Sequence, residues 1–326
     1  MKFAPPLGAS LVRAATWGLV GGRGRVTPLV PAAGPSRSCL VLADDGTELY
    51  AEISGDPAAP VTYVLCHGYA LTSACWCYQR AALAANARVV TWDQRGHGRS
   101  RRGPAAHATI DQLGRDLLAV LEQTRTAGPV VLVGHSMGGM GIMALAGRRP
   151  DLFGDPVTAV ALLGTSAGPV ASDPWLALAH RLGPPALAGL RRIPGVLRAA
   201  PVRELAHSLI SRYAFSAQAR PGLADFVVEM IESVPLEVLA DFLPSFREHD
   251  KRAALGALGN VGCLVMAGAD DTVTPWRESE TIAETVPSAR LVVLPSAGHA
   301  FPLEHPGKVN AQLRALGGDF ARLRSA

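Results

Sequence analysis

The chain has 326 residues, 48% of them hydrophobic and 18% charged, which provides enough apolar material for a sizeable core. This composition excludes a chain that is disordered throughout. The net charge of +4 arises from scattered arginines and not from basic runs, which argues against nucleic acid as a partner.

The first 35 residues form an N-terminal extension ahead of the first predicted strand. Its apolar stretch, residues 7–22, is interrupted by Arg13, and the pieces on either side are too short to span a bilayer. Only Lys2 marks an n-region and no good cleavage site follows, so export is disfavoured. We predict a disordered leader or a surface arm, with weak contact to a membrane surface as a further hypothesis.

From residue 39 onward, short β-branched runs alternate with longer runs rich in Ala, Leu and Arg, which is typical of a mainly parallel sheet flanked by helices. Asp44-Asp45-Gly46 is a hairpin signal that makes the first two strands antiparallel. Helices are predicted over residues 109–124, 137–148 and 306–323. Strands are predicted over residues 38–43, 48–53, 61–66, 88–92, 130–133, 157–163, 263–267 and 290–294.

Residues 165–258 interrupt this alternation. A structureless loop of that length is improbable, so we predict a helical insertion on top of the sheet. Its charge is polarised, basic up to Arg220 and acidic from Pro221 to Asp250. Pairing between two helical layers, or solvated faces, explains this polarity; a basic rim that attracts an anionic substrate or lipid is the alternative. The predicted helical pieces are residues 175–182, 186–192, 203–213, 223–233 and 236–246.

The turn Gly134-His135-Ser136-Met137-Gly138 carries the strongest chemical signal, because it joins a buried-type strand to a helix-compatible run. In such a G-x-S-x-G turn, side chains two residues before and after the serine would clash with the crowded backbone. The pattern predicts Ser136 as a nucleophile. The helix N-terminus behind it places the backbone N–H of Met137 where an oxyanion would form.

A serine hydroxyl needs a neighbouring base. Among nine histidines, His299 fits best, because it lies in a loop after a predicted strand and before the last helix. An imidazole in this role needs an anionic partner. Asp270 and Asp271 both follow the strand predicted over 263–267, so two carboxylates compete for it.

Two further loops follow early strands. The backbone N–H of Tyr69, after the strand 61–66, is predicted to be the second oxyanion donor, and we interpret His67 as a residue that holds this loop. The Gly-rich loop from Asp93 to Ser100 lacks the Lys and the helix start of a phosphate-binding loop. We therefore predict a rigid structural turn there.

As a set, these motifs resemble the α/β-hydrolase superfamily, in the branch of serine esterases, lipases and related enzymes with a helical cap. The match runs from about residue 39 to the C-terminus. The G-x-x-D-x-x-x-P spacing of the resemblance favours Asp271 over Asp270, and the chain order Ser, Asp, His agrees with it. The motifs are His67-Gly68, Asp93 to Ser100, Gly134 to Gly138, Gly268 to Pro275 and Gly298-His299.

The resemblance implies a mostly parallel eight-stranded sheet, with the core in residues 36–164 and 259–326 and a cap, residues 165–258, inserted after strand 6. It also implies two-step acyl transfer, and we expect a hydrophobic or lipid-like small-molecule ester as substrate. Thioesterases, carbon–carbon bond hydrolases and cofactor-free perhydrolases share the triad, so these reactions stay open, as does a ligand receptor without turnover. Epoxide hydrolases and haloalkane dehalogenases carry an Asp where Ser136 stands.

The five cysteines are odd in number and lack both C-x-x-C spacing and histidines at zinc distances. We interpret them as reduced packing thiols, which favours a cytoplasmic location, with membrane association left open. The sequence holds no ligand cluster or dinucleotide fingerprint, so no metal, nucleotide or flavin is implied. Oligomeric state cannot be read from it.

Overall fold

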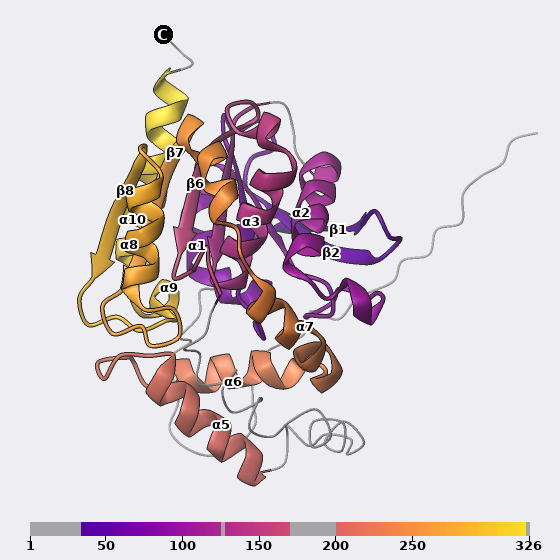
Figure 1. The fold of residues 1–326 in the computed structure, drawn as a ribbon, viewed down its shortest axis with the longest axis vertical. Helices are drawn as coiled ribbons and strands as arrows, with labels where there is room; N and C mark the ends of the chain where they lie inside the picture. The colour runs from indigo at the N-terminus through magenta and orange to yellow at the C-terminus, as the bar shows by residue number, and fades with distance from the viewer. Residues whose placement is uncertain (1–33, 125–127, 170–199, 324–326) are drawn as a thin grey trace, which may run out of the picture.

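The computed structural model describes residues 34–124, 128–169 and 200–323 (Figure 1). An eight-stranded sheet lies at its centre, with strand order β1-β2-β4-β3-β5-β6-β7-β8. The pairs β1–β2 and β2–β4 are antiparallel and all later pairs are parallel. The strands are β1 (Ser36–Leu42), β2 (Glu48–Ser54), β3 (Thr62–Cys66), β4 (Arg88–Trp92), β5 (Val130–His135), β6 (Val157–Leu163), β7 (Gly262–Gly268) and β8 (Ala289–Leu294).

All eight predicted strands are confirmed, and the predicted hairpin joins β1 to β2 with Gly46 at φ +80°. The central strands are buried on both faces, which accounts for their continuous apolar sequences. In β5, Leu132 packs into the core on one face of the sheet and Val131 and Val133 into the core on the other. This alternation sends successive side chains to opposite layers.

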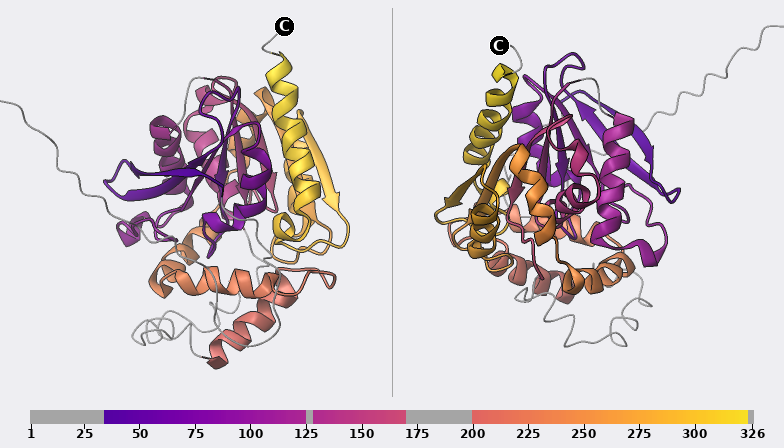
Figure 2. Two further views of the ribbon diagram at one scale, coloured as in Figure 1. Left: turned by 180° about the vertical axis from the view of Figure 1, so that it is seen from behind. Right: turned by 45° about the horizontal axis from the view of Figure 1, so that its top comes forward.

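Helices cover both faces of the sheet (Figures 1 and 2). Those numbered α2, α3 and α8 pack on one face, and α1 and α10 on the other. The predictions for α2, α3 and α10 are confirmed, whereas α1 and α8 were not predicted. The helices of these layers are α1 (Cys77–Leu83), α2 (Ile110–Thr124), α3 (Met137–Arg148), α8 (Trp276–Thr285), α9 (Phe301–Glu304) and α10 (Pro306–Leu323), with 3-10 turns η1 (Ser73–Trp76), η2 (Ala105–His107), η3 (Pro150–Leu152) and η5 (Arg252–Asn260).

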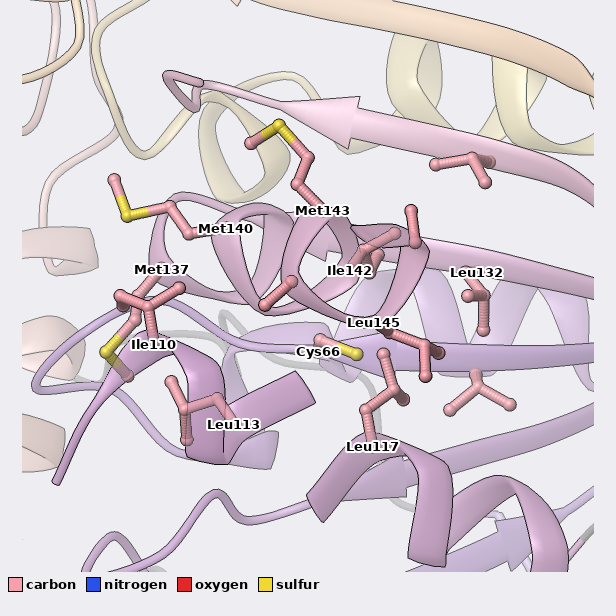
Figure 3. Packing of buried hydrophobic residues seen from close by; sticks show 14 of the residues in the cluster. Cys66, Ile110, Leu113, Leu117, Leu132, Met137, Met140, Ile142, Met143 and Leu145 are labelled. Carbon is pink, nitrogen blue, oxygen red and sulfur yellow. The ribbon is translucent and has the colours of Figure 1, made fainter. Parts of the chain in front are cut away.

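The packing of α2 and α3 on the sheet fixes the start of α3 (Figure 3). Met137 at the first turn of α3 is fully buried, and its cluster includes Leu113 and Leu117 of α2 and Cys66 at the end of β3. Burying one such large apolar side chain contributes about 1.5–3 kcal/mol. The first turn of α3, which starts directly after Ser136, is thus anchored in the main hydrophobic core.

Between β6 and β7, the described residues form three helices: α5 (Ala200–Tyr213), α6 (Leu223–Ser233) and α7 (Leu236–Glu248). They lie across one end of the sheet, where the tip of β8 points (Figure 1). They contain the predicted pieces 203–213, 223–233 and 236–246; the pieces predicted over 175–182 and 186–192 lie outside the described residues.

The polarised charge of this insertion is partly explained by pairing between its helices. Arg203 of α5 lies 3.4 Å from Glu232 of α6, and His207 lies 3.6 Å from Asp225. Within the part of the chain that the structure describes, the basic and acidic segments therefore face each other. These two contacts agree with the first interpretation of the pattern, pairing between helical layers.

The predicted N-terminal extension lies outside the described residues up to residue 33. All five cysteines are free thiols, and burial raises the pKa of Cys66 and Cys263 to about 12 and that of Cys77 to about 11. Among residues 34–124, 128–169 and 200–323, no helix combines the length and hydrophobicity needed to cross a membrane.

Candidate active site

Ser136 occupies a strained turn between β5 and α3. Its backbone has φ 52° and ψ −120°, a conformation that non-glycine residues adopt at a cost of about 1–3 kcal/mol. The N–H of Ser136 donates to the carbonyl of Leu163 at the end of β6, and its own carbonyl accepts from Gly139, Met140 and the Thr165 hydroxyl. These bonds hold the turn in place although its conformation is unfavourable.

The two predicted glycines of this turn are required by close backbone contacts. A Cβ at Gly138 would lie 2.2 Å from the carbonyl oxygen of Cys66, and one at Gly134 would lie 2.5 Å from the amide of Gly139. The first contact brings the start of α3 directly onto the end of β3. The turn and the loop that follows β3 therefore lie side by side.

Asp271 and His299, the residues predicted as acid and base, are in hydrogen-bond contact. The Nδ1 atom of His299 lies 2.8 Å from Asp271 Oδ2, and both side chains come from loops that follow strands, β7 and β8 respectively. Asp271 Oδ1 accepts the backbone N–H groups of Val273 and Thr274, each at 2.9 Å. Because an ionised carboxylate can only accept, the proton of this bond lies on Nδ1, and in the neutral ring the lone pair is then on Nε2.

The competing carboxylate does not take this place. Asp270 is exposed, whereas Asp271 is buried with its side chain against the imidazole. The structure thus brings Asp271, and not Asp270, to His299.

His135 links the acid–base pair to the serine turn. Its Nε2 donates to the carbonyl of His299 at 2.9 Å, and the two imidazole rings lie 4.7 Å apart. Since His135 directly precedes Ser136, the loop that carries His299 is fixed next to the turn of Ser136. The position of Gly164, just after β6, is likewise close to both Asp271 and His299, at 3.3 and 3.5 Å from an added Cβ.

The loop after β3 reaches the same place. A Cβ at Gly68 would lie 3.3 Å from the Cβ of Ser136, so Tyr69, the next residue, lies beside the serine. Its ring packs edge-on against Phe246 of α7, and its hydroxyl donates to the carbonyl of Leu239. The residues predicted as oxyanion donors therefore both belong to segments at this turn: Tyr69 follows Gly68 in the contacting loop, and Met137 follows Ser136 in the chain.

His67 and His97 connect this loop to the loop after β4. His67 Nε2 accepts the backbone N–H of Gln94 and its Nδ1 donates to Gly68, while His97 Nε2 accepts from Ala70 and its Nδ1 donates to Arg95. Burial lowers the pKa of both rings, that of His97 to about 3. Both are therefore neutral connectors between loops, as interpreted from the sequence for His67.

The loop after β4 is a structural turn, as predicted. Asp93 is buried, and its carboxylate accepts the backbone N–H groups of Ser73 at 2.7 Å and Arg99 at 3.0 Å. Arg95 projects from the same loop into a buried ion pair with Asp116, where its Nε and Nη2 donate at 2.7 and 2.6 Å. These carboxylates are satisfied by the protein itself and anchor the turn.

A family model described as the alpha/beta hydrolase family matches residues 63–312, the span that supplies every element of this site. The chain belongs to the alpha/beta hydrolase family. It is similar to a thermophilic esterase from Thermogutta terrifontis, with 28% identity, a TM-score of 0.71, and coverage of 86% of this chain and 97% of that one.

Two curated relatives of this hydrolase differ in the reaction that their names state. Epoxide hydrolase A of Mycobacterium tuberculosis is 29% identical, over 82% of this chain and 94% of its own length. The bifunctional esterase/perhydrolase DCH of Acinetobacter calcoaceticus is 27% identical, over 85% of this chain and 98% of its own. Similarity thus identifies the chain as a hydrolase, and the bond that it cleaves has to be inferred from the site.

Sequence reasoning missed two side chains of this hydrolase site. The Thr274 hydroxyl donates to Asp271 Oδ2 at 3.0 Å and lies 3.2 Å from His299 Nδ1. His135 was read only as part of the serine motif. For Thr274 a signal was available, because an Asp side chain in a loop often accepts backbone N–H groups just after it, which draws the next residues toward its carboxylate. The contact of His135 spans 164 residues of sequence and has no local signature.

Proposed function

We propose that the chain is a serine hydrolase that cleaves a carboxylic ester through an acyl-enzyme intermediate. The observation that carries this proposal is the connection from Asp271 through His299 and His135 to the strained turn of Ser136. A serine at such a turn, next to an imidazole whose other nitrogen is held by a buried carboxylate, is the arrangement that nucleophilic acyl transfer requires.

In the proposed first step, the Ser136 hydroxyl oxygen attacks the ester carbonyl carbon and His299 Nε2 accepts the hydroxyl proton. The tetrahedral oxyanion accepts hydrogen bonds from the backbone N–H groups of Tyr69 and Met137. As the intermediate collapses, the bond to the alkoxy group breaks, and His299 returns the proton to the departing alcohol. The acyl group is then esterified to Ser136.

In the second step, His299 removes a proton from a water molecule, whose oxygen attacks the acyl carbonyl. Collapse releases the carboxylic acid and returns the proton to the Ser136 oxygen. Throughout, Asp271 keeps the Nδ1–H tautomer in place and stabilises the positive charge that forms on the ring. The Thr274 hydroxyl helps to orient the same carboxylate oxygen.

A hydrophobic acyl group is the substrate that the surroundings favour. The insertion places α7 over the loop of Tyr69, where Phe246 packs against the tyrosine ring and the half-buried Leu239 receives its hydroxyl. Apolar side chains close to a nucleophile favour an apolar ligand. Phe242 of the same helix is fully buried in the core cluster and so anchors α7 in this position.

Labelling by a fluorophosphonate probe tests the nucleophile. Wild-type protein should react at Ser136, and Ser136→Ala should lose the label, while Ser296→Ala should keep it as a matched control. Ser296 also has a positive φ, of 53°, but is exposed and lies outside the proposed machinery. A wild-type protein that stays unlabelled would reject the proposal in favour of a binding protein without turnover.

Esters of graded acyl length, with thioester analogues beside them, test the substrate. We expect medium-chain esters to be hydrolysed faster than acetyl esters, and faster than the matching thioesters. The opposite order of chain lengths would reject the apolar acyl site, and a preference for thioesters would move the assignment to a thioesterase with the same triad.

A further inference from the structure

The carboxylate of Glu304, at the end of the short helix α9, joins two distant parts of the chain. Its Oε2 accepts the backbone N–H of Gly298 at 2.7 Å, and its Oε1 accepts that of Ser216 at 2.5 Å. Gly298 directly precedes His299, whereas Ser216 belongs to the helical insertion, just after α5. The Glu304 side chain thus accepts hydrogen bonds from the loop of the proposed base, His299, and from the segment of the insertion that follows α5.

Two further contacts bring the same two segments together, through Ala300 and Gly298, and a third joins the insertion to the loop of Asp271, through Thr272. The N–H of Ala300 donates to the carbonyl of Ala214 at 2.7 Å, and the Thr272 hydroxyl lies 3.5 Å from the carbonyl of Tyr213. A Cβ at Gly298 would lie 2.7 Å from the carbonyl oxygen of Ala214, so only glycine permits this approach. The insertion is therefore seated directly on the loop that carries His299.

A carboxylate is the side chain that this junction needs. Both partners of Glu304 are N–H donors, and an ionised carboxylate accepts on each of its two oxygens. A glutamine of the same shape has one accepting oxygen and one NH2 group. Its NH2 group would face one of the two backbone N–H groups, so that bond would be lost. Hydrogen bonds to a charged acceptor are also stronger than those between neutral groups.

From these contacts we propose that Glu304 is a positioning residue, which fixes the backbone on either side of His299 in register with residues 214–216 of the insertion. The proposal rests on the proposed function, because it treats His299 as the base. Its chemical consequence is that the imidazole stays within reach of the Ser136 hydroxyl while the insertion is seated. Loss of the carboxylate lets the loop of His299 move and slows the attack of Ser136.

The test compares wild type with Glu304→Gln by two measurements. Amide hydrogen exchange of peptides that cover residues 214–217 and 297–300 should become about 10-fold faster, since each amide loses a charged acceptor. The rate constant of fluorophosphonate labelling at Ser136 should fall by about 10-fold or more. The rate constant is the decisive quantity, because partial unfolding lowers the final extent of labelling and leaves the rate of the folded fraction unchanged.

Glu278→Gln is the matched control. Glu278 also ties the insertion to the core, since the Ser166 hydroxyl donates to its Oε2 at 2.7 Å, but this bond is at the other root of the insertion and an amide oxygen can still accept it. We expect both measurements to stay near wild type at residues 214–217 and 297–300. If Glu304→Gln does not fold, Glu304→Asp keeps the charge with a shorter reach and should show smaller changes in the same direction.

The outcomes separate the two proposals. If exchange accelerates in Glu304→Gln but the labelling rate stays at the wild-type value, Glu304 is a structural clamp only and its positioning role is overturned. Unchanged exchange at both segments overturns the clamp itself. A wild-type protein that does not label rejects the proposed function instead, while the exchange measurement still reports on the clamp.

Discussion

Acid should destabilise this protein, because histidines beside the proposed site, among them His97 and His135, are buried in the neutral form. Burial is the main cause that lowers the pKa of His97 and of His135 to about 3, with a smaller contribution from a neighbouring imidazole in each case. In the unfolded chain both would titrate near pH 6.5. Below that pH the unfolded state takes up protons that the folded state does not.

The magnitude follows from linkage. Each group reduces the free energy of unfolding by about 1.4 kcal/mol per pH unit between its two pKa values. From pH 7.5 to pH 4.5 the two histidines together should therefore remove about 5 kcal/mol, a large part of the stability of an ordinary domain. Most unfolded aspartates and more than half of the unfolded glutamates are still ionised at pH 4.5, so the histidines account for most of the loss above that pH.

Urea denaturation at pH 7.5, 6.0 and 4.5 measures this loss, with His97→Asn as the comparison. The substitution removes one titrating group, so the variant should lose about 2–3 kcal/mol less than wild type across the interval, whatever its stability at pH 7.5. The two proteins losing equal amounts of free energy would refute the assignment of His97 as a buried neutral imidazole.

Three further predictions concern the carboxylates. Asp271→Asn should lower kcat by about 10⁴-fold in ester hydrolysis, while Asp270→Asn, at an exposed position, stays near wild type; equal effects would contradict the assignment of the acid. Thr274→Val removes a bond to Asp271, so the carboxylate stabilises the imidazolium more and the acid limb of the kcat/KM profile should move to higher pH; Thr274→Ser should restore it, and an unmoved limb argues against this role. Asp116→Ala leaves the buried Arg95 without its bidentate partner, and urea denaturation should show a loss of about 3 kcal/mol; a loss below about 1 kcal/mol would mean that other groups compensate.

The sequence was sufficient for the sheet because its strands are short β-branched runs buried on both faces. Helices α3 and α10 were predicted with the bounds that the structure has. Helix α8 was missed for a physical reason: its sequence is mostly polar, and of its apolar residues Trp276, Ile282 and Ala283 only Ile282 is fully buried. Helix α1 has seven residues, which is too short for a periodic pattern to emerge.

The parts of the candidate site that lie in a local sequence motif could be predicted. The serine turn and the loop of His299 each have a spacing that follows from backbone geometry. The choice between Asp270 and Asp271 depends on which side chain turns inward, and that required the fold. Glu304 was not singled out, because its two partners lie 6 and 88 residues away and are backbone amides, which no side-chain motif records.

Neutral imidazoles around the serine also bear on the proposed chemistry. His67, His97 and His135 each donate a ring N–H to a backbone carbonyl, so they join loops without adding charge, whereas His299 donates to a carboxylate. A charged ring at the 4.7 Å that separates His135 from His299 would oppose the imidazolium by about 3–4 kcal/mol at an effective dielectric constant of about 20. That penalty corresponds to a rate that is slower by a factor of about 10² to 10³. Because burial keeps His135 neutral, the loop of the proposed base is fixed by a hydrogen bond that does not compete with the charge the reaction must form.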